Sequence, residues 1–343
     1  MLYIFLAYIA LCLVGANFKS IKTFNKDLLS KETTNAINGI FVGIILFSHF
    51  NSYLTFTNPT DLIYLKIIRK IGQLMVTTFF FYSGYGILES IKNKKDYMKH
   101  FFKNRILKLF IIFGFAVVLW IIYDLLTHAD YTVKDYIVAF TGLKSIGNSS
   151  WFIFATFWLY IFTLIGFNVF KKKEDILKGI LLTTIGSLLY ISYMKYHFDG
   201  YWYNTVLCFN LGMFISYYKE KIIAHFKDNT VYSLTFLALL FILWFCFQSM
   251  NYLLQFLVYS TTFSFVVFLC SYKINVGNRM LKYLGDNTFN IYIMQRMSYI
   301  SLQKLGLLDY NIYLYFAASI VLTIVIVFVF DKMLKFILKR IYN

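Results

Sequence analysis

The stretch from Asn35 to Tyr53 combines a long apolar run with one titratable side chain, His49, flanked by Ser48, Asn51 and Ser52. Ser48 and Ser52 share a helix face because they are four residues apart. A histidine in a polar pocket can take a proton from an alcohol, since its unperturbed pKa is about 6.5. An ionisable group inside a membrane costs free energy unless it is paired or functional. Two interpretations follow: His49 is a general base, or it only hydrogen-bonds to a neighbouring helix.

A second stretch, Phe79 to Ile87, places Ser83, Gly84, Tyr85 and Gly86 in one predicted helix. Small residues let membrane helices approach each other closely, and close packing is the favoured interpretation of the glycines. Ser83 and Tyr85 are nevertheless candidates for lining a polar channel.

The segment from Lys92 to Lys108 is dense in basic residues. Membrane topology and attraction to anionic lipids account for most of this charge. Arg105 and Lys108, however, are three residues apart at the start of the next apolar run and share a helix face. The pair could hold the phosphates of an anionic donor such as an acyl-CoA.

Two further stretches bring aromatic and polar groups into apolar segments. Trp151 and Trp158 bracket a predicted helix, either as interface anchors or as a platform for a sugar ring. The stretch from Leu284 to Arg296 carries polar side chains that need internal partners. They predict a polar cavity and are Asn287, Asn290, Gln295 and Arg296.

Composition tells which elements must position these groups. The 343 residues are 59% hydrophobic and only 14% charged, and the mean hydropathy is +0.65. A soluble domain has about 25% charged residues, so the chain is predicted to be all-α and polytopic, an integral membrane protein. Eleven apolar segments are long enough to cross a bilayer core of about 30 Å. They lie at about 1–17, 35–57, 71–91, 106–127, 151–170, 177–197, 203–218, 230–250, 252–271, 286–305 and 312–334.

Lysine and arginine set the expected orientation. They concentrate in alternate loops, at 18–34, 91–108, 171–178, 219–227, 272–283 and 332–340. Because cytoplasmic loops collect positive charge, the N-terminus is expected outside and the C-terminus in the cytoplasm of a multi-pass cell membrane protein. The net charge of +17 therefore indicates membrane lipids as partners rather than nucleic acid. The four cysteines have no metal-ligand or disulfide spacing, and no metal is expected.

Together these stretches resemble membrane-bound acyltransferase family 3, the integral-membrane O-acyltransferases of surface glycans. NAINGIFVGIILFSH resembles the family's glycine-bearing helix that ends in a histidine, here His49. Four further stretches match the family's other motifs in the same order. They are FFYSGY at 80–85, the basic pair Arg105 and Lys108, WFI from Trp151, and the LG-x-x-[ST]-[FY]-x-[IL]-Y-[IL] pattern at 284–293. The chain departs from the family pattern at Asn35, Asn38, Lys108 and Gln295.

The resemblance implies a ten-helix core at 35–343, preceded at 1–34 by an extra transmembrane helix and a basic inner loop. It implies transfer of an acyl group, acetyl in the first instance, from acetyl-CoA or another acyl-CoA to a hydroxyl of a cell-surface or lipid-linked glycan. His49 would be the general base, and Arg105 and Lys108 would bind the donor. The expected substrate channel is lined by Ser48, Ser52, Ser83, Tyr85, Trp151, Asn287, Tyr292 and Gln295.

Two alternatives stay open. A transporter or flippase of a lipid-linked sugar would also use polar helices and aromatic platforms. Transporters typically have paired repeats and helices broken by Gly or Pro, whereas this sequence has a single proline, in a loop, and no visible repeat. A non-catalytic membrane sensor would need neither His49 nor the basic pair. A covalent acyl-enzyme on Ser48, Ser52 or Ser83 is a variant of the enzyme hypothesis.

Overall fold

The computed structural model describes residues 1–20, 23–25, 28–56, 58–248 and 252–342. Nearly all of its regular structure is helical, as the sequence predicts, and the two short strands form one ladder. The long elements are α1 (Leu2–Leu13), α2 (Lys31–Phe50), α3 (Pro59–Ile71), α4 (Met75–Asn93), α5 (Lys108–Leu126), α7 (Trp151–Val169), α8 (Ile176–His197), α9 (Leu207–Tyr217), α11 (Asn229–Gln248), α12 (Leu253–Lys273), α14 (Thr288–Lys304) and α16 (Ile312–Tyr342). The short ones are β1 (Asn17–Phe18), α6 (Val133–Ala139), α10 (Lys219–His225), β2 (Ile274–Asn275), α13 (Arg279–Asp286) and α15 (Leu307–Tyr310).

Single turns join several of these helices. Most of them are 3₁₀ turns, and one is a π-helical segment directly before α5. They are η1 (Asn51–Tyr53), η2 (Gly72–Leu74), η3 (Tyr97–His100), the π-helical η4 (Phe102–Leu107), η5 (Lys173–Asp175) and η6 (Gly200–Trp202).

Eight helical segments in the described part of the chain are long and apolar enough to cross a membrane. One of them joins α3, η2 and α4 into a run of 35 residues. The expected count of eleven spans is not confirmed, because α1, α9 and α14 have only 12, 11 and 17 residues. Only 11% of the α11 window is buried within the protein, although that helix is strongly apolar. Such a surface requires lipid rather than water, so the chain is a multi-pass membrane protein.

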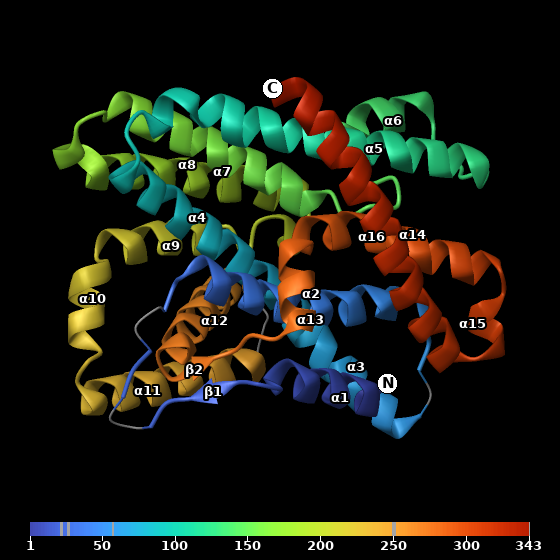
Figure 1. Cartoon of the computed structure of the whole chain (residues 1–343), viewed down its shortest axis with the longest axis horizontal. Helices are drawn as coiled ribbons and strands as arrows, with labels where there is room; N and C mark the ends of the chain where they lie inside the picture. The colour runs from blue at the N-terminus through green and yellow to red at the C-terminus, as the bar shows by residue number, and fades with distance from the viewer. Residues whose placement is uncertain (21–22, 26–27, 57, 249–251, 343) are drawn as a thin grey trace.

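The helix α2 lies at the centre of the molecule, between α14 and the lower group of α1 and α3, while α5, α7 and α8 run along the upper side (Figure 1). Twelve of its 20 residues are buried. Its apolar residues therefore face protein on most sides, whereas those of α5 and α16 are largely left for lipid. This central position is what places the last turn of α2, with His49, inside the protein.

Glycines set the closest helix contacts. A Cβ on Gly84 of α4 would collide with the carbonyl oxygen of Phe209 on α9, and one on Gly212 with that of Phe81 on α4. Both helices therefore meet backbone to backbone, as small residues allow in membrane proteins. Gly84 thus makes the close packing contact predicted from the sequence.

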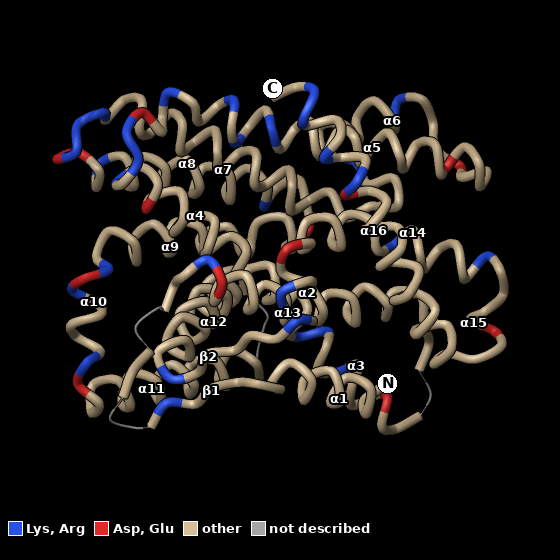
Figure 2. Tube along the Cα trace, in the orientation of Figure 1, with Lys and Arg blue, Asp and Glu red and all other residues tan. Residues whose placement is uncertain are grey.

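The N-terminal segment is attached to the segment that precedes α13. Strands β1 and β2 pair antiparallel, with Asn17 opposite Asn275. The side-chain amide of Asn278 donates to the carbonyl oxygens of Leu11 (3.0 Å) and Val14 (3.2 Å). These bonds hold α1 against the turn from which α13 starts. Lysine and arginine gather around this region, α10 and the α7–α8 turn (Figure 2).

Candidate active site

His49 lies in the last turn of α2 and is partly buried. The helix starts at the N-cap Ser30, whose hydroxyl accepts a hydrogen bond from the Thr33 amide (3.2 Å). The imidazole lies beside the Tyr292 ring of α14, with 5.9 Å between ring centroids. Its Nδ1 is buried and has no hydrogen-bond partner among the described residues. Buried polar atoms are normally paired, so this nitrogen is available to a ligand.

A small cavity of about 140 Å³ lies directly at His49. Ser48, Gln73 of η2, Trp151 and Tyr292 contribute polar or aromatic groups to its wall. The Nε2 of Gln73 and the hydroxyl of Tyr292 are buried without a partner in the described structure. The space is therefore lined by free donors and acceptors on several elements, which suits a polar reaction centre rather than a hydrocarbon core.

A second cavity, of about 440 Å³, extends from Tyr292 toward Arg105. Arg105 belongs to η4, and its Nε donates to the Tyr97 hydroxyl at 2.9 Å. Ser83 also lines this cavity and shares a hydrogen bond of 3.1 Å with the Tyr160 hydroxyl. The cavity thus joins a fixed cation to the region around His49.

A third cavity, also of about 440 Å³, lies on the other side of His49. Arg296 of α14, Trp151, Tyr201 and the loop at 145–150 form its wall. His49, Trp151 and Tyr201 also line the small cavity, and Tyr292 lines both that cavity and the one at Arg105. The three spaces therefore form a row with shared walls, and His49 lies in the middle of it.

The loop at 145–150 packs against Trp120 of α5, and the preceding Lys144 forms an ion pair with Asp135 of α6. Gly147 has φ +93° and lies directly against the Trp120 ring, where any side chain would collide. Trp120 Nε1 in turn donates to the carbonyl oxygen of Ile293 on α14 (3.1 Å). Hydrogen bonds from the backbone and hydroxyl of Thr132, with the nearby Lys144 ammonium, lower the pKa of Asp135 to about 2. That carboxylate therefore stays charged at neutral pH and caps α6 beside the loop.

The structure brings many of the sequence-predicted residues together and leaves others apart. The residues in the walls of the three cavities are Ser48, His49, Ser83, Arg105, Trp151 and Tyr292. Lys108 and Ser52 are exposed, and neither lines these cavities. Three more predicted residues also lie outside the walls. Tyr85 faces Lys219, and Asn287 donates a hydrogen bond to the Tyr283 carbonyl. Gln295 is fully buried and donates a hydrogen bond to the Tyr292 carbonyl.

Several wall residues were not among the sequence-predicted site residues. Arg296 was expected only to need an internal partner, but it lies one helical turn after Tyr292 and faces the third cavity. That i,i+4 spacing was a usable signal. Five more wall residues have buried polar atoms without a partner in the described structure. Gln73 lies on η2 and Asn148 and Ser150 lie in a loop, where no periodicity marks a face, whereas Asn38 and Tyr82 lie on α2 and α4.

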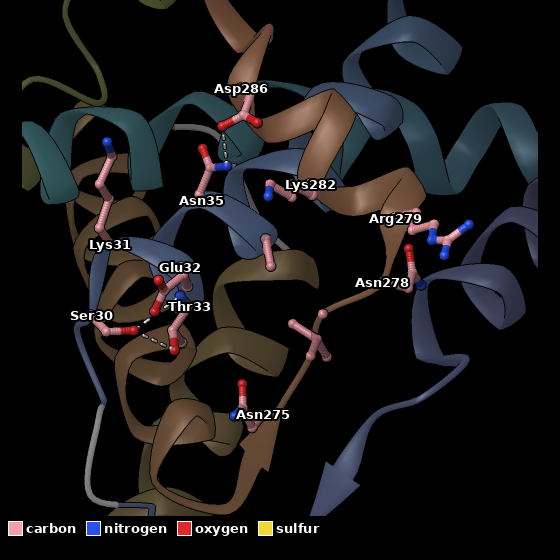
Figure 3. Close-up of a pocket in the computed structure, with 13 residues that line it drawn as sticks. Ser30, Lys31, Glu32, Thr33, Asn35, Asn275, Asn278, Arg279, Lys282 and Asp286 are labelled. Carbon is pink, nitrogen blue, oxygen red and sulfur yellow. Dashed lines mark hydrogen bonds between the residues drawn. The ribbon is translucent and has the colours of Figure 1, made fainter.

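A larger pocket of about 620 Å³ lies between the start of α2 and the β2–α13 turn (Figure 3). The basic side chains of Lys31, Arg279 and Lys282 border it. Asp286 lines both this pocket and the Arg105 cavity, and it accepts a hydrogen bond of 2.8 Å from the Asn35 amide between them. The row of cavities therefore continues into a pocket lined by three cations and by the two carboxylates of Glu32 and Asp286.

Comparison with known proteins gave one finding. A family model described as an acyltransferase domain, that of acyltransferase family 3, matches residues 33–332. The matched range includes α2, α4, η4 and α14, which carry the walls of the three cavities. Neither the curated proteins nor the solved structures gave a match.

Proposed function

Because the chain belongs to acyltransferase family 3, we propose that it is an integral-membrane O-acyltransferase that uses an acyl-CoA donor and a glycan acceptor. The acyl group is acetyl in the first instance, and the acceptor is a cell-surface or lipid-linked glycan. The observation that carries this proposal is the position of His49, midway in a row of cavities that starts at Arg105 and ends at the 145–150 loop. Two substrates approaching from opposite ends would meet at its imidazole.

The proposed reaction is direct transfer. The unpaired nitrogen of His49 takes the proton of the acceptor hydroxyl while the hydroxyl oxygen attacks the thioester carbonyl carbon. The C–S bond then breaks, and the imidazolium returns the proton to the CoA thiolate. The Tyr292 hydroxyl and the Gln73 amide lie in the same small cavity and have free hydrogen-bonding capacity. Either can stabilise the oxyanion of the tetrahedral intermediate.

The donor is assigned to the Arg105 side. Phosphates and pyrophosphates pair well with guanidinium groups, and Arg105 is held by Tyr97 with its side chain in the cavity wall. The pocket bordered by Lys31, Arg279 and Lys282 adds positive charge directly beyond Asp286 (Figure 3). These cations fit the several phosphates of a coenzyme A, with its thin pantetheine arm passing along the Arg105 cavity. Lys108 would act only from outside that cavity wall.

The proposed orientation places this basic end in the cytoplasm of the cell membrane, with the N-terminus outside. Its support is the distribution of lysine and arginine, which favours one set of loops (Figure 2). A cytoplasmic donor side also agrees with the chemistry, because acyl-CoA is a cytoplasmic metabolite and the glycan is bound for the surface.

The test uses the full chain reconstituted in liposomes with radiolabelled acetyl-CoA and surface polysaccharide from the source cells. Label should pass to the polysaccharide in an alkali-labile ester, and mass spectrometry should show the matching mass increment. A flippase of a lipid-linked sugar would instead move unmodified lipid across the bilayer. Translocation without any ester formation would overturn the acyltransferase assignment.

A further inference from the structure

The cavity beside the 145–150 loop contains a cation without a counter-charge. In the described part of the chain, no Asp or Glu side chain forms an ion pair with Arg296. The Tyr53 hydroxyl lies close to the guanidinium, but the Nε of Arg296 is buried without a partner in the described structure. The side chain as a whole is only partly buried, but a buried donor without a partner is unfavourable, so this arginine has unused binding capacity.

The type of group that would satisfy Arg296 follows from its geometry. A guanidinium presents a planar set of donors that matches the two oxygens of a carboxylate or phosphate. The other groups in the cavity wall are neutral: the described residues beside Arg296 there are His49, Ser145, Asn148, Ser149, Ser150, Trp151, Tyr201 and Trp202. An anion entering this cavity would therefore meet one cation and no competing carboxylate.

The same cavity has the features of a sugar site. Trp151 and Tyr201 lie at its wall with ring centroids 5.9 Å apart and planes at 71°. The volume of about 440 Å³ is within the range of about 300–1,000 Å³ typical of small-molecule sites. Asn148 Nδ2 and Ser150 Oγ are buried without partners in the described structure. Aromatic faces and free polar atoms together suit a ring with several hydroxyl groups.

We propose that this cavity recognises an anionic sugar, whose carboxylate or phosphate pairs with Arg296 while its ring packs against Trp151 or Tyr201. The inference rests on the proposed function only in calling this sugar the acyl acceptor. His49 lines the same cavity, so a sugar held in this way presents a hydroxyl to the imidazole. The acceptor is then a residue such as a uronic acid or a sugar phosphate, rather than a neutral hexose.

Binding of defined sugars tests this without any turnover. The probes are methyl glucuronide, glucose 6-phosphate and methyl glucoside, added to the purified full chain in detergent with no acyl donor. Quenching of tryptophan fluorescence reports binding, since Trp151 and Trp202 line the cavity. At least one anionic sugar should bind about tenfold more tightly than the glucoside, an effect within the range of one charged hydrogen-bonded contact. The anionic arm that binds identifies carboxylate or phosphate as the group.

Variants then assign the effect to Arg296. Arg296→Gln should reduce anionic-sugar affinity to that of methyl glucoside, and Arg296→Lys should keep only part of the preference because it lacks the fork. Lys304→Gln is the matched control, since Lys304 lies on the same helix, two turns further on, and contacts the Thr127 carbonyl outside this cavity. If Arg296→Gln does not fold, the wild-type comparison and the Lys variant still decide the question.

Two results would overturn the inference. One is equal binding of the glucoside and both anionic sugars by the wild type; the other is anionic binding that survives in Arg296→Gln. Neither result bears on acyl transfer, which is measured separately with labelled acetyl-CoA. Conversely, loss of the acyltransferase assignment would leave an Arg296-dependent sugar site in place.

Discussion

The imidazole of His49 is the group that both proposed substrates must reach. It lies where the small central cavity meets the cavity beside the 145–150 loop, and its Nδ1 is free of protein partners in the described structure. The sequence located this residue because a single titratable group in an apolar run is conspicuous. It could not show which helix faces the ring, since the contact with Tyr292 joins residues that are distant in the chain.

His49→Ala should lower the turnover of acyl transfer by about 10²–10⁴-fold, the usual contribution of a general base. The variant should still fold, because Nδ1 of the imidazole has no hydrogen-bond partner in the described structure and the substitution removes no such bond. His197→Ala is the control, since that histidine is exposed at the end of α8. The measurement is transfer of labelled acetyl in liposomes. Undiminished transfer by His49→Ala would remove the imidazole from the mechanism.

Arg105→Ala should raise the KM for acyl-CoA by about tenfold or more, because a charged hydrogen bond to phosphate is worth about 1.5–3 kcal/mol. The acceptor KM should stay the same, as Arg105 lies in the other cavity. Lys103→Ala tests whether any cation in η4 suffices, since Lys103 is exposed and lies outside the cavity wall. Steady-state kinetics with acyl-CoA varied gives the answer; an unchanged donor KM would remove Arg105 from the donor site.

At the scale of elements, α4 and α9 are held together by direct backbone contact. Gly84→Ala places a methyl group against the Phe209 carbonyl, so one helix must shift. Overpacking of this kind costs about 1–3 kcal/mol and should lower the midpoint of thermal unfolding in detergent. Gly86→Ala is the matched control on the same helix, since nothing lies within 4 Å of a Cβ there. Equal midpoints for the two variants would show that the close contact does not limit stability.

Helix class was predictable from composition, but the number of spanning helices was not. Hydropathy counts apolar residues and does not show where a helix stops: the apolar run at 203–218 begins with a turn at 203–206, and only the 11 residues of α9 in it are α-helical. The run at 286–305 contains the polar residues Asn290, Gln295 and Arg296, which lower its mean hydropathy. Polar residues are tolerated there because α14 faces polar cavities and the protein interior rather than lipid. The features that make α14 part of the site are the ones that weaken its membrane signal.

At the scale of the whole molecule, two observations bear on how the chain sits in a membrane. The apolar helices α5, α11 and α16 are largely unburied within the protein, and three basic residues, Lys31, Arg279 and Lys282, border the pocket at one end of the row of cavities. Together these observations predict that donor and acceptor approach from opposite faces of the bilayer. A transferase with both cavities on one face would need no such row.

Cysteine labelling tests this directly. Lys134→Cys, at the exposed start of α6, should react with a membrane-impermeant thiol reagent in intact cells, because α6 is expected on the outer face. Lys172→Cys, exposed in the turn before η5, should react only after the membrane is permeabilised. The native thiols give little background, as Cys12, Cys208 and Cys246 are buried and Cys270 is only partly exposed. The reverse pattern would put Arg105 outside the cell, where no acyl-CoA is made. Labelling of both positions in intact cells would also contradict the orientation, because the turn with Lys172, on the expected donor side, would then face the outside.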